Sequence, residues 1–287
     1  MQTWRVGTVT ITKVLELEAT GGTRFILPDA TPEACRTTMP WLRPHFMGDD
    51  GKLKMSVHAL LIATPSRRII VDTCLGNDKH GRAVPGWNEL HGPFLQDLAA
   101  AGFPRESIDT VVCTHLHVDH VGWNTMLVDG RWVPTFPNAR YLMGRAEFEY
   151  WRDQDAWAEQ VTVFGDSVQP VVDAGLHDLV ATDHRLCEEV SLVPTLGHTP
   201  GHVSVRIASE GAEALITGDF LHHPCQMARP EWAAAVDYDK ASSTATRREV
   251  FTRLAGTRTL LIGTHFAGAT AGHVARDGDG FRLIPVA

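Results

Sequence analysis

Three histidines and an aspartate fall within six residues of this chain, in the stretch CTHLHVDHVGWN from Cys113 to Asn124. The preceding segment, IDTVVCT (108–114), is rich in β-branched residues and predicts a short strand that runs directly into the histidines. Imidazoles and carboxylates are good metal ligands and do not suit an apolar core. The fold must therefore deliver the end of a strand to a site that uses these side chains.

Other predicted strands also end at residues of ligand type. His198 and His202 lie in LGHTPGHVS, Asp219 in LITGDF and His265 in IGTHF. In open α/β sheets the loops at the strand ends converge, so we expect these side chains to share one site. A carboxylate can bridge two metal ions, whereas an imidazole nitrogen has a single lone pair. Five histidines and two aspartates would suit a two-metal hydrolytic centre.

The rest of the chain alternates between strand and helix patterns and shows no internal repeat. At 287 residues and 44% apolar composition, it is long enough for one large α/β domain with a sizeable core. We predict a strand near the N-terminus (6–15), a hairpin of strands (56–64 and 67–73), helices (93–103 and 242–256), a strand joined to a helix (139–151), and further strands (108–114, 189–195, 201–209, 212–219 and 258–266).

Residues 19–55 predict an irregular segment, because glycines and prolines interrupt any periodicity. The segment also carries apolar side chains, among them Phe25, Trp41 and Phe46. Such a segment packs onto the body of the protein, or it lines a pocket or forms a lid.

Charge and hydropathy narrow the classes of partner. The net charge of -8 gives no general attraction for nucleic acid or anionic membranes, and no apolar run is long enough to span a bilayer. The N-terminus lacks a signal-peptide pattern, and the five cysteines show no CxxC spacing, so we expect reduced thiols in a cytoplasmic protein. The expected partner is a small-molecule substrate, and the sequence leaves open whether the protein forms a homodimer.

The ordered motifs THLHVDH, GHTPGH, TGD and GTH, between residues 114 and 265, resemble those of the metallo-β-lactamase superfamily. The resemblance implies an α/β fold, a four-layer αβ/βα sandwich with two mixed β-sheets and the metal site at one edge. It also implies a single domain over residues 1–287.

The resemblance implies a ligand set as well. One ion would be held by His115, His117 and His198, and the second by Asp119, His120 and His265, with Asp219 bridging them. The ions would be divalent, first of all Zn²⁺, with Mn²⁺, Co²⁺ or Fe²⁺ as alternatives. A hydroxide between the two cations would be the nucleophile.

Two further residues near the motifs have more open roles. His202 is expected to shape the site rather than bind an ion. Asp72, in IIVDTCLGN, would accept the free N–H of a ligand histidine or cap a loop.

This chain has both His120 and Asp219. True β-lactamases of this fold carry a different residue at one of these two positions or at both, so the combination departs from them. It is similar to lactonases, glyoxalase-type thioesterases and methyl parathion hydrolase. The segments HVDHVGWN, FPNARYLMGRAEFEYW and DYDKASSTATRREVF resemble the branch that holds methyl parathion hydrolase and broad-specificity acyl-homoserine lactonases. In that branch a long N-terminal segment packs over the site, which makes Phe25, Trp41 and Phe46 candidate pocket walls.

These features predict a metal-dependent hydrolase for a lactone, ester or related small electrophile. Organophosphate triester hydrolysis and a thioesterase are alternatives, and a mononuclear iron oxidoreductase of the persulfide type is the alternative from another class. The candidate catalytic residues are Asp119, Asp219 and His222. His222 stands where many lactonases carry a tyrosine, and it would either donate a hydrogen bond to the substrate or buttress the site.

Overall fold

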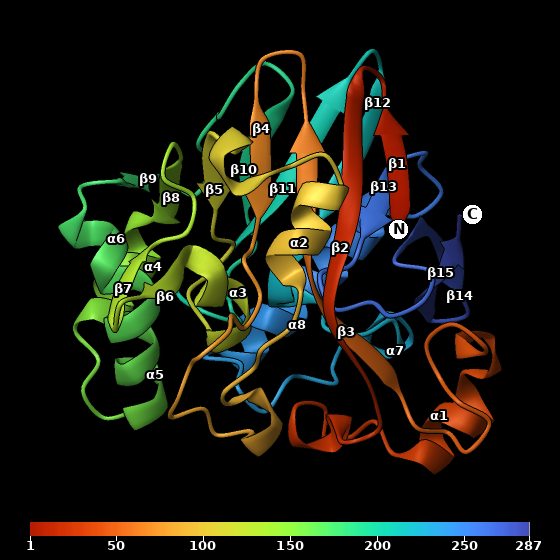
Figure 1. The fold of residues 1–287 in the computed structure, drawn as a ribbon. Helices are drawn as coiled ribbons and strands as arrows, with labels where there is room; N and C mark the ends of the chain where they lie inside the picture. The colour runs from red at the N-terminus through yellow and green to blue at the C-terminus, as the bar shows by residue number, and fades with distance from the viewer. Residues whose placement is uncertain (287) are drawn as a thin grey trace.

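The computed structural model describes residues 1–286, and two β-sheets form its centre (Figure 1). The first sheet has seven strands in the order β1-β2-β3-β4-β5-β8-β9. Its strands are β1 (Gln2–Val6), β2 (Val9–Thr20), β3 (Lys54–Ala63), β4 (Arg68–Val71), β5 (Thr110–Val112), β8 (Arg140–Gly144) and β9 (His177–Val180). Strands β1 to β4 pair antiparallel, and β4 also begins the parallel part, which continues through β5, β8 and β9. The sheet is therefore mixed.

The second sheet has six strands in chain order from β10 to β15, and it is also mixed because β12 and β13 pair parallel. Its strands are β10 (Val190–Pro194), β11 (Val203–Ser209), β12 (Ala212–Ile216), β13 (Leu260–Ile262), β14 (Ala271–Asp277) and β15 (Gly280–Pro285). A separate hairpin joins β6 (Thr125–Val128) to β7 (Arg131–Pro134).

Helices cover the outer faces of both sheets. They are α1 (Pro32–Thr38), α2 (Phe94–Ala100), α3 (Val118–Val121), α4 (Arg145–Arg152), α5 (Ala158–Val163), α6 (Gln169–Asp173), α7 (Cys225–Ala228) and α8 (Lys240–Leu254), with a π-helical turn at Phe164–Val168. Within residues 1–286, none of these helices is long and apolar enough to cross a membrane.

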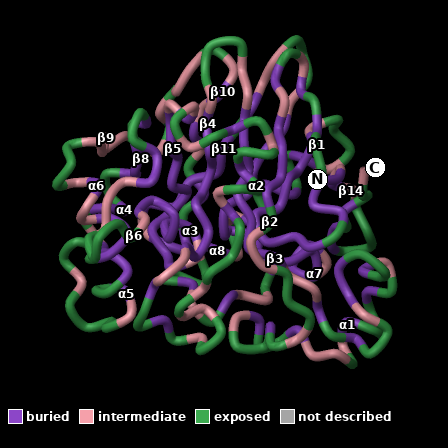
Figure 2. The backbone as a smooth tube through the Cα atoms, viewed as in Figure 1, coloured by how far each residue is buried: buried purple, intermediate pink, exposed green. Residues whose placement is uncertain are grey.

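Alternation along the strands builds the layers. On β4, Ile69 joins the cluster between the two sheets, and its neighbour Ile70 joins the cluster under α2 and α4. Successive residues of a strand point to opposite faces, so a strand covered on both sides is apolar throughout. A third cluster packs α7 and α8 on the outer face of the second sheet. Strands β5 and β13 are buried at every residue, and buried backbone fills the middle of the molecule in Figure 2. The four-layer sandwich with two mixed sheets is confirmed.

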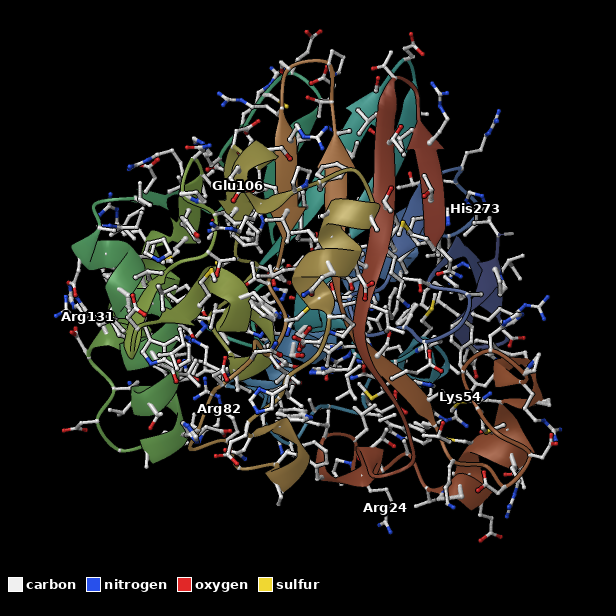
Figure 3. The ribbon with its side chains drawn as sticks, in the orientation of Figure 1. Arg24, Lys54, Arg82, Glu106, Arg131 and His273 are labelled. Carbon is white, nitrogen blue, oxygen red and sulfur yellow. The ribbon has the colours of Figure 1, made fainter. Side chains whose placement is uncertain are left out.

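The segment 19–55 is more regular than its sequence predicts. Thr31 accepts a hydrogen bond from the backbone N–H of Ala34 and Pro32 occupies the first turn, so a short helix, α1, forms. Seven residues are too few to show a helical period, which is why the sequence hid it. Lys54, at the lower right of Figure 3, donates to the Pro44 carbonyl at 3.0 Å and ties the segment to β3.

The three proposed pocket walls of this segment have different environments. Phe25 is 54% exposed and Trp41 is half-buried, whereas Phe46 is fully buried. Phe46 packs edge-on against Phe266 and His223 in the core outside the second sheet. The prediction for Phe46 as a pocket wall is wrong, because a side chain with no accessible surface meets no substrate.

The strand pairing also decides where the loops meet. β4 and β5 run parallel in the first sheet, and β12 and β13 run parallel in the second. Parallel neighbours end at the same edge. The loops after these four strands therefore face one another across the sandwich.

We expect Phe46→Ala to lower the free energy of unfolding by about 3–5 kcal/mol, because it removes a buried aromatic ring and leaves a cavity. Phe25→Ala is the matched control, and its exposed ring predicts a change within about 1 kcal/mol. Urea unfolding of the two variants measures both values. Equal losses would contradict the different burial of the two rings.

Candidate metal centre

The first motif follows β5 without a break. His115 and His117 lie in the loop, and α3 begins directly after His117, so Asp119 and His120 project from one short helical turn. His198 follows β10, Asp219 lies in the turn after β12, and His265 follows β13. The structure brings all seven predicted ligand residues together at the edge where these strands end.

Three histidines form one group. His117 Nδ1 lies 3.1 Å from His115 Nε2 and 3.0 Å from His198 Nε2. Burial, together with the neighbouring imidazoles, holds the pKa of His115 and His117 well below the usual range. Both rings are therefore neutral near pH 7, and their lone pairs are available to a cation.

Asp119, His120 and His265 form the second group, with His265 Nε2 3.3 Å from His120 Nε2 and Nε2 atoms of both rings 3.6 Å from Asp119 oxygens. Asp219 lies between the groups. Its Oδ2 is 3.4 Å from His120 Nε2 and 3.7 Å from His198 Nε2.

The electrostatics of Asp219 favour the ionised form. Burial by itself would raise the pKa of its carboxyl, but His265 and His120 hold that pKa well below the usual range. Asp219 Oδ1 is buried and accepts no hydrogen bond of normal geometry from the described residues, although His265 Nε2 lies 3.1 Å from it. A buried carboxylate oxygen without a donor is costly unless a cation lies against it. The donor set therefore fits two divalent ions.

The outward nitrogens of four of these rings meet acceptors, which fixes each ring and turns its other nitrogen to the centre. His120 Nδ1 lies 2.8 Å from Asp72, His198 Nδ1 lies 2.8 Å from Asp237, His265 Nδ1 donates to the Ser56 carbonyl at 2.9 Å, and His115 Nδ1 lies 3.1 Å from Thr114 Oγ1.

Asp72 has both of the roles that its sequence left open. It accepts from His120, and it also accepts from the backbone N–H and the hydroxyl of Thr114, each at 2.8 Å. The residue has a positive φ of 56°, so the chain turns sharply there to aim its carboxylate at both partners.

His202 lies beside the site with both ring nitrogens engaged. Its Nε2 accepts from the Asp219 backbone N–H at 2.7 Å, and its Nδ1 lies 2.9 Å from the Thr195 carbonyl. Burial lowers the pKa of His202 to about 3, so the ring is neutral. No lone pair is left for an ion, which agrees with the expectation that His202 shapes the site.

His222 is buried, and its Nε2 lies 3.2 Å from Asp219 Oδ2. It forms a compact group with His198 and Asp219. Its Nδ1 is buried without a hydrogen-bond partner among the described residues. The ring thus contacts the carboxylate that joins the two groups.

Two buried acids were missed by the sequence reasoning. Asp237 holds His198 and also accepts from Ser243 and the backbone of Ala234. Glu147 accepts from the backbone N–H groups of Leu116 and Gly201, so it joins the first motif to the His198 loop. In sequence, Asp237 lies two residues before the cap of α8 and looks like an ordinary turn residue. Glu147 looks like part of the polar face of a helix, so neither residue gave a signal.

Comparison with known proteins identifies the family. The metallo-beta-lactamase superfamily profile matches residues 54–275, and the chain belongs to that superfamily. An N-acyl homoserine lactonase from Bacillus sp is 25% identical over 170 residues, which cover 55% of this chain and 60% of that protein. A probable metallo-hydrolase from Mycobacterium tuberculosis is 28% identical over 182 residues, which cover 58% of this chain and 57% of that protein. The chain thus aligns with about 60% of the length of these relatives.

Solved structures share the fold over nearly the whole chain. AidC, a dizinc quorum-quenching lactonase solved with a product, N-hexnoyl-L-homoserine, is 20% identical with a TM-score of 0.78, and the match covers 100% of this chain and 97% of AidC. The hydrolase AbOPH of the same superfamily is 24% identical with a TM-score of 0.80, over 99% of this chain and 97% of AbOPH.

Removing the charge of Asp237 tests the hold on His198. We expect Asp237→Asn to weaken divalent-metal binding roughly 10- to 100-fold, since partners behind metal ligands have effects of that size. Asp239→Asn is the matched control, because Asp239 caps α8 and touches no histidine of the site. Titration of both metal-free variants with a divalent metal measures their affinities. Unchanged affinity in Asp237→Asn would remove this role.

Proposed function

We propose that this protein is a dinuclear metal-dependent hydrolase that cleaves the ester bond of a small lactone or ester. The observation that carries the proposal is the convergence of seven ligand-type side chains in two groups joined by Asp219. Family membership, lactonases among the sequence relatives and a dizinc lactonase of the same fold support it.

In this proposal, one ion is held by His115, His117 and His198, and the other by Asp119, His120 and His265, with Asp219 shared. Two divalent ions held there would polarise an ester carbonyl and lower the pKa of a water molecule toward neutral. Nitrogen-rich ligand sets of this kind suit Zn²⁺. A mononuclear iron oxidoreductase would leave the second group of three ligands without a role.

The chain's own residues supply rigidity and an apolar approach. The rings of Trp151 and Trp157 lie 5.2 and 5.7 Å from that of His117, and Trp157 is 39% exposed. The side chain of Tyr238 is exposed, and its backbone N–H donates a hydrogen bond to the His198 carbonyl, which places Tyr238 next to the site. The exposed rings of Trp157 and Tyr238 would take up the apolar part of an ester next to the polar centre, whereas Trp151 is buried behind the His117 ring.

A hydrolysis panel on metal-loaded protein tests this function. We expect two metal equivalents per chain and turnover of lactones or aryl esters, together with loss of activity after chelation. Organophosphate triesters, a thioester and a β-lactam belong in the same panel, because the fastest substrate assigns the class.

Variants in the same panel link the activity to the proposed centre. Asp219→Ala should lose metal and rate, whereas Cys225→Ala should retain both, because the buried Cys225 contacts neither group of ligands. One firmly bound equivalent, or no ester hydrolysis in wild type, would sink the proposal.

For His222, we propose that it acts through Asp219, because its Nε2 contacts the carboxylate rather than open space. His222→Ala should weaken metal binding roughly 10- to 100-fold while the rate per bound metal pair changes little. Metal content and kcat are measured on the same samples. Full metal occupancy with kcat lowered roughly a hundredfold would instead assign direct transition-state contact.

A further inference from the structure

Strand β2 carries none of the proposed metal ligands, yet two of its charged side chains reach the interior. Lys13 is 8% exposed, and Glu16 is half-buried. Charged groups in such places need strong local partners. Their partners adjoin residues of the proposed second ion site.

The ammonium group of Lys13 meets three acceptors. It donates to Thr270 Oγ1 at 2.7 Å, to the Phe266 carbonyl at 3.1 Å and to Ser56 Oγ at 3.4 Å. Three N–H groups thus match three oxygens. Within residues 1–286, no carboxylate lies within ion-pair distance of Lys13. These three hydrogen bonds, together with the more distant charge of Glu18, offset the burial of its charge.

These contacts enclose His265. Phe266 is the next residue in the chain, and the Ser56 carbonyl accepts the Nδ1–H of His265 at 2.9 Å. The backbone N–H of Ser56 donates in turn to the His265 carbonyl at 3.0 Å. Lys13 therefore binds both backbone segments that set the position and the ring orientation of His265.

Glu16 reaches its partners because β2 contains a bulge. Leu15 pairs with His58 and Leu17 pairs with Val57, so Glu16 is the extra residue without a partner on β3. A bulge redirects a side chain that regular pairing would place elsewhere.

The redirected Glu16 carboxylate accepts three hydrogen bonds, from the backbone N–H groups of Leu75 and Gly76 at 2.7 and 3.1 Å and from Trp123 Nε1 at 2.7 Å. One group thereby grips two separate segments: the loop after β4 and the chain that leaves α3.

The two segments that Glu16 grips also bind each other. Thr73 donates to the His120 carbonyl at 2.8 Å and accepts from the Trp123 N–H at 2.8 Å. Gly76 lies close to Gly122, and a Cβ atom added at Gly76 would lie 2.8 Å from the carbonyl of Gly122. This unit holds Asp72 against His120, so Glu16 is one contact removed from the Asp119–His120 turn.

We infer that Lys13 and Glu16 are positioning residues above all for the second ion, Lys13 through His265 and Glu16 through Asp119 and His120. The inference rests on the proposed function for the existence of two ion sites. The first ion depends less on β2. Asp237 holds His198, and only His115, through Thr114 and Asp72, shares a support with the second ion.

The test is titration of metal-free protein with Zn²⁺ and with Co²⁺, followed by calorimetry and by the visible spectrum of bound Co²⁺. Lys13→Met and Glu16→Gln should each weaken the second equivalent roughly 10- to 100-fold and change the first equivalent much less. Glu249→Gln is the matched control, because Glu249 is exposed on α8 and makes no side-chain hydrogen bond or ion pair among the described residues.

Further measurements separate positioning from folding. Thermal melting of the metal-free variants reports stability directly. Lys13→Arg keeps a cation but places its donors differently, so it should fold and still weaken the second equivalent. Glu16→Gln neutralises a half-buried carboxylate and leaves the buried Lys13 ammonium group in place. It therefore tests the role of Glu16 separately from that of Lys13.

Two outcomes would overturn the inference: variants that bind both equivalents like wild type, or variants that lose both equivalents equally. If wild type itself binds a single equivalent, the proposed dinuclear function fails instead. The wild-type titration therefore distinguishes the two failures.

Discussion

The structure depends on a cluster of electron-rich atoms that are buried against one another. His117 Nδ1 lies within 3.1 Å of two other imidazole nitrogens, and Asp219 Oδ2 lies within 3.7 Å of ring nitrogens from both groups. Lone pairs this close repel unless a cation or a shared proton lies between them. The fold therefore has to supply rigid outer partners that hold each ring in place against that repulsion.

Those partners come from elements far apart in the chain. Asp72 follows β4, Ser56 lies on β3 and Asp237 precedes α8, and each holds one imidazole. The backbone adapts where space runs out. Gly218 has a φ of 57°, and a Cβ there would lie 2.5 Å from His202 Nε2, so only glycine permits the contact that orders Asp219.

Much of this was predictable because the signals are local. Strands that stop at ligand residues, as at His115 and Asp219, follow from runs of β-branched residues. Helix 242–256 was expected, and α8 (Lys240–Leu254) starts two residues earlier at an aspartate cap. The errors have physical reasons too. Helix α1 is too short to show a period, and Phe46 lies in the core because tertiary packing, not hydropathy, decides which aromatic ring is covered.

By itself, the sequence determined the strands and the ligand-type residues at their ends, since motif order and periodicity are properties of the chain alone. The two mixed sheets followed from the family that those ordered motifs resemble. Only the tertiary structure decided which groups support those residues. Asp237, Glu147, Lys13 and Glu16 look like ordinary surface charges in sequence. They act through contacts between residues as far apart as Lys13 and Phe266, and no local pattern encodes such a distance. The bulge that redirects Glu16 is equally invisible, because it exists only in the pairing of β2 with β3.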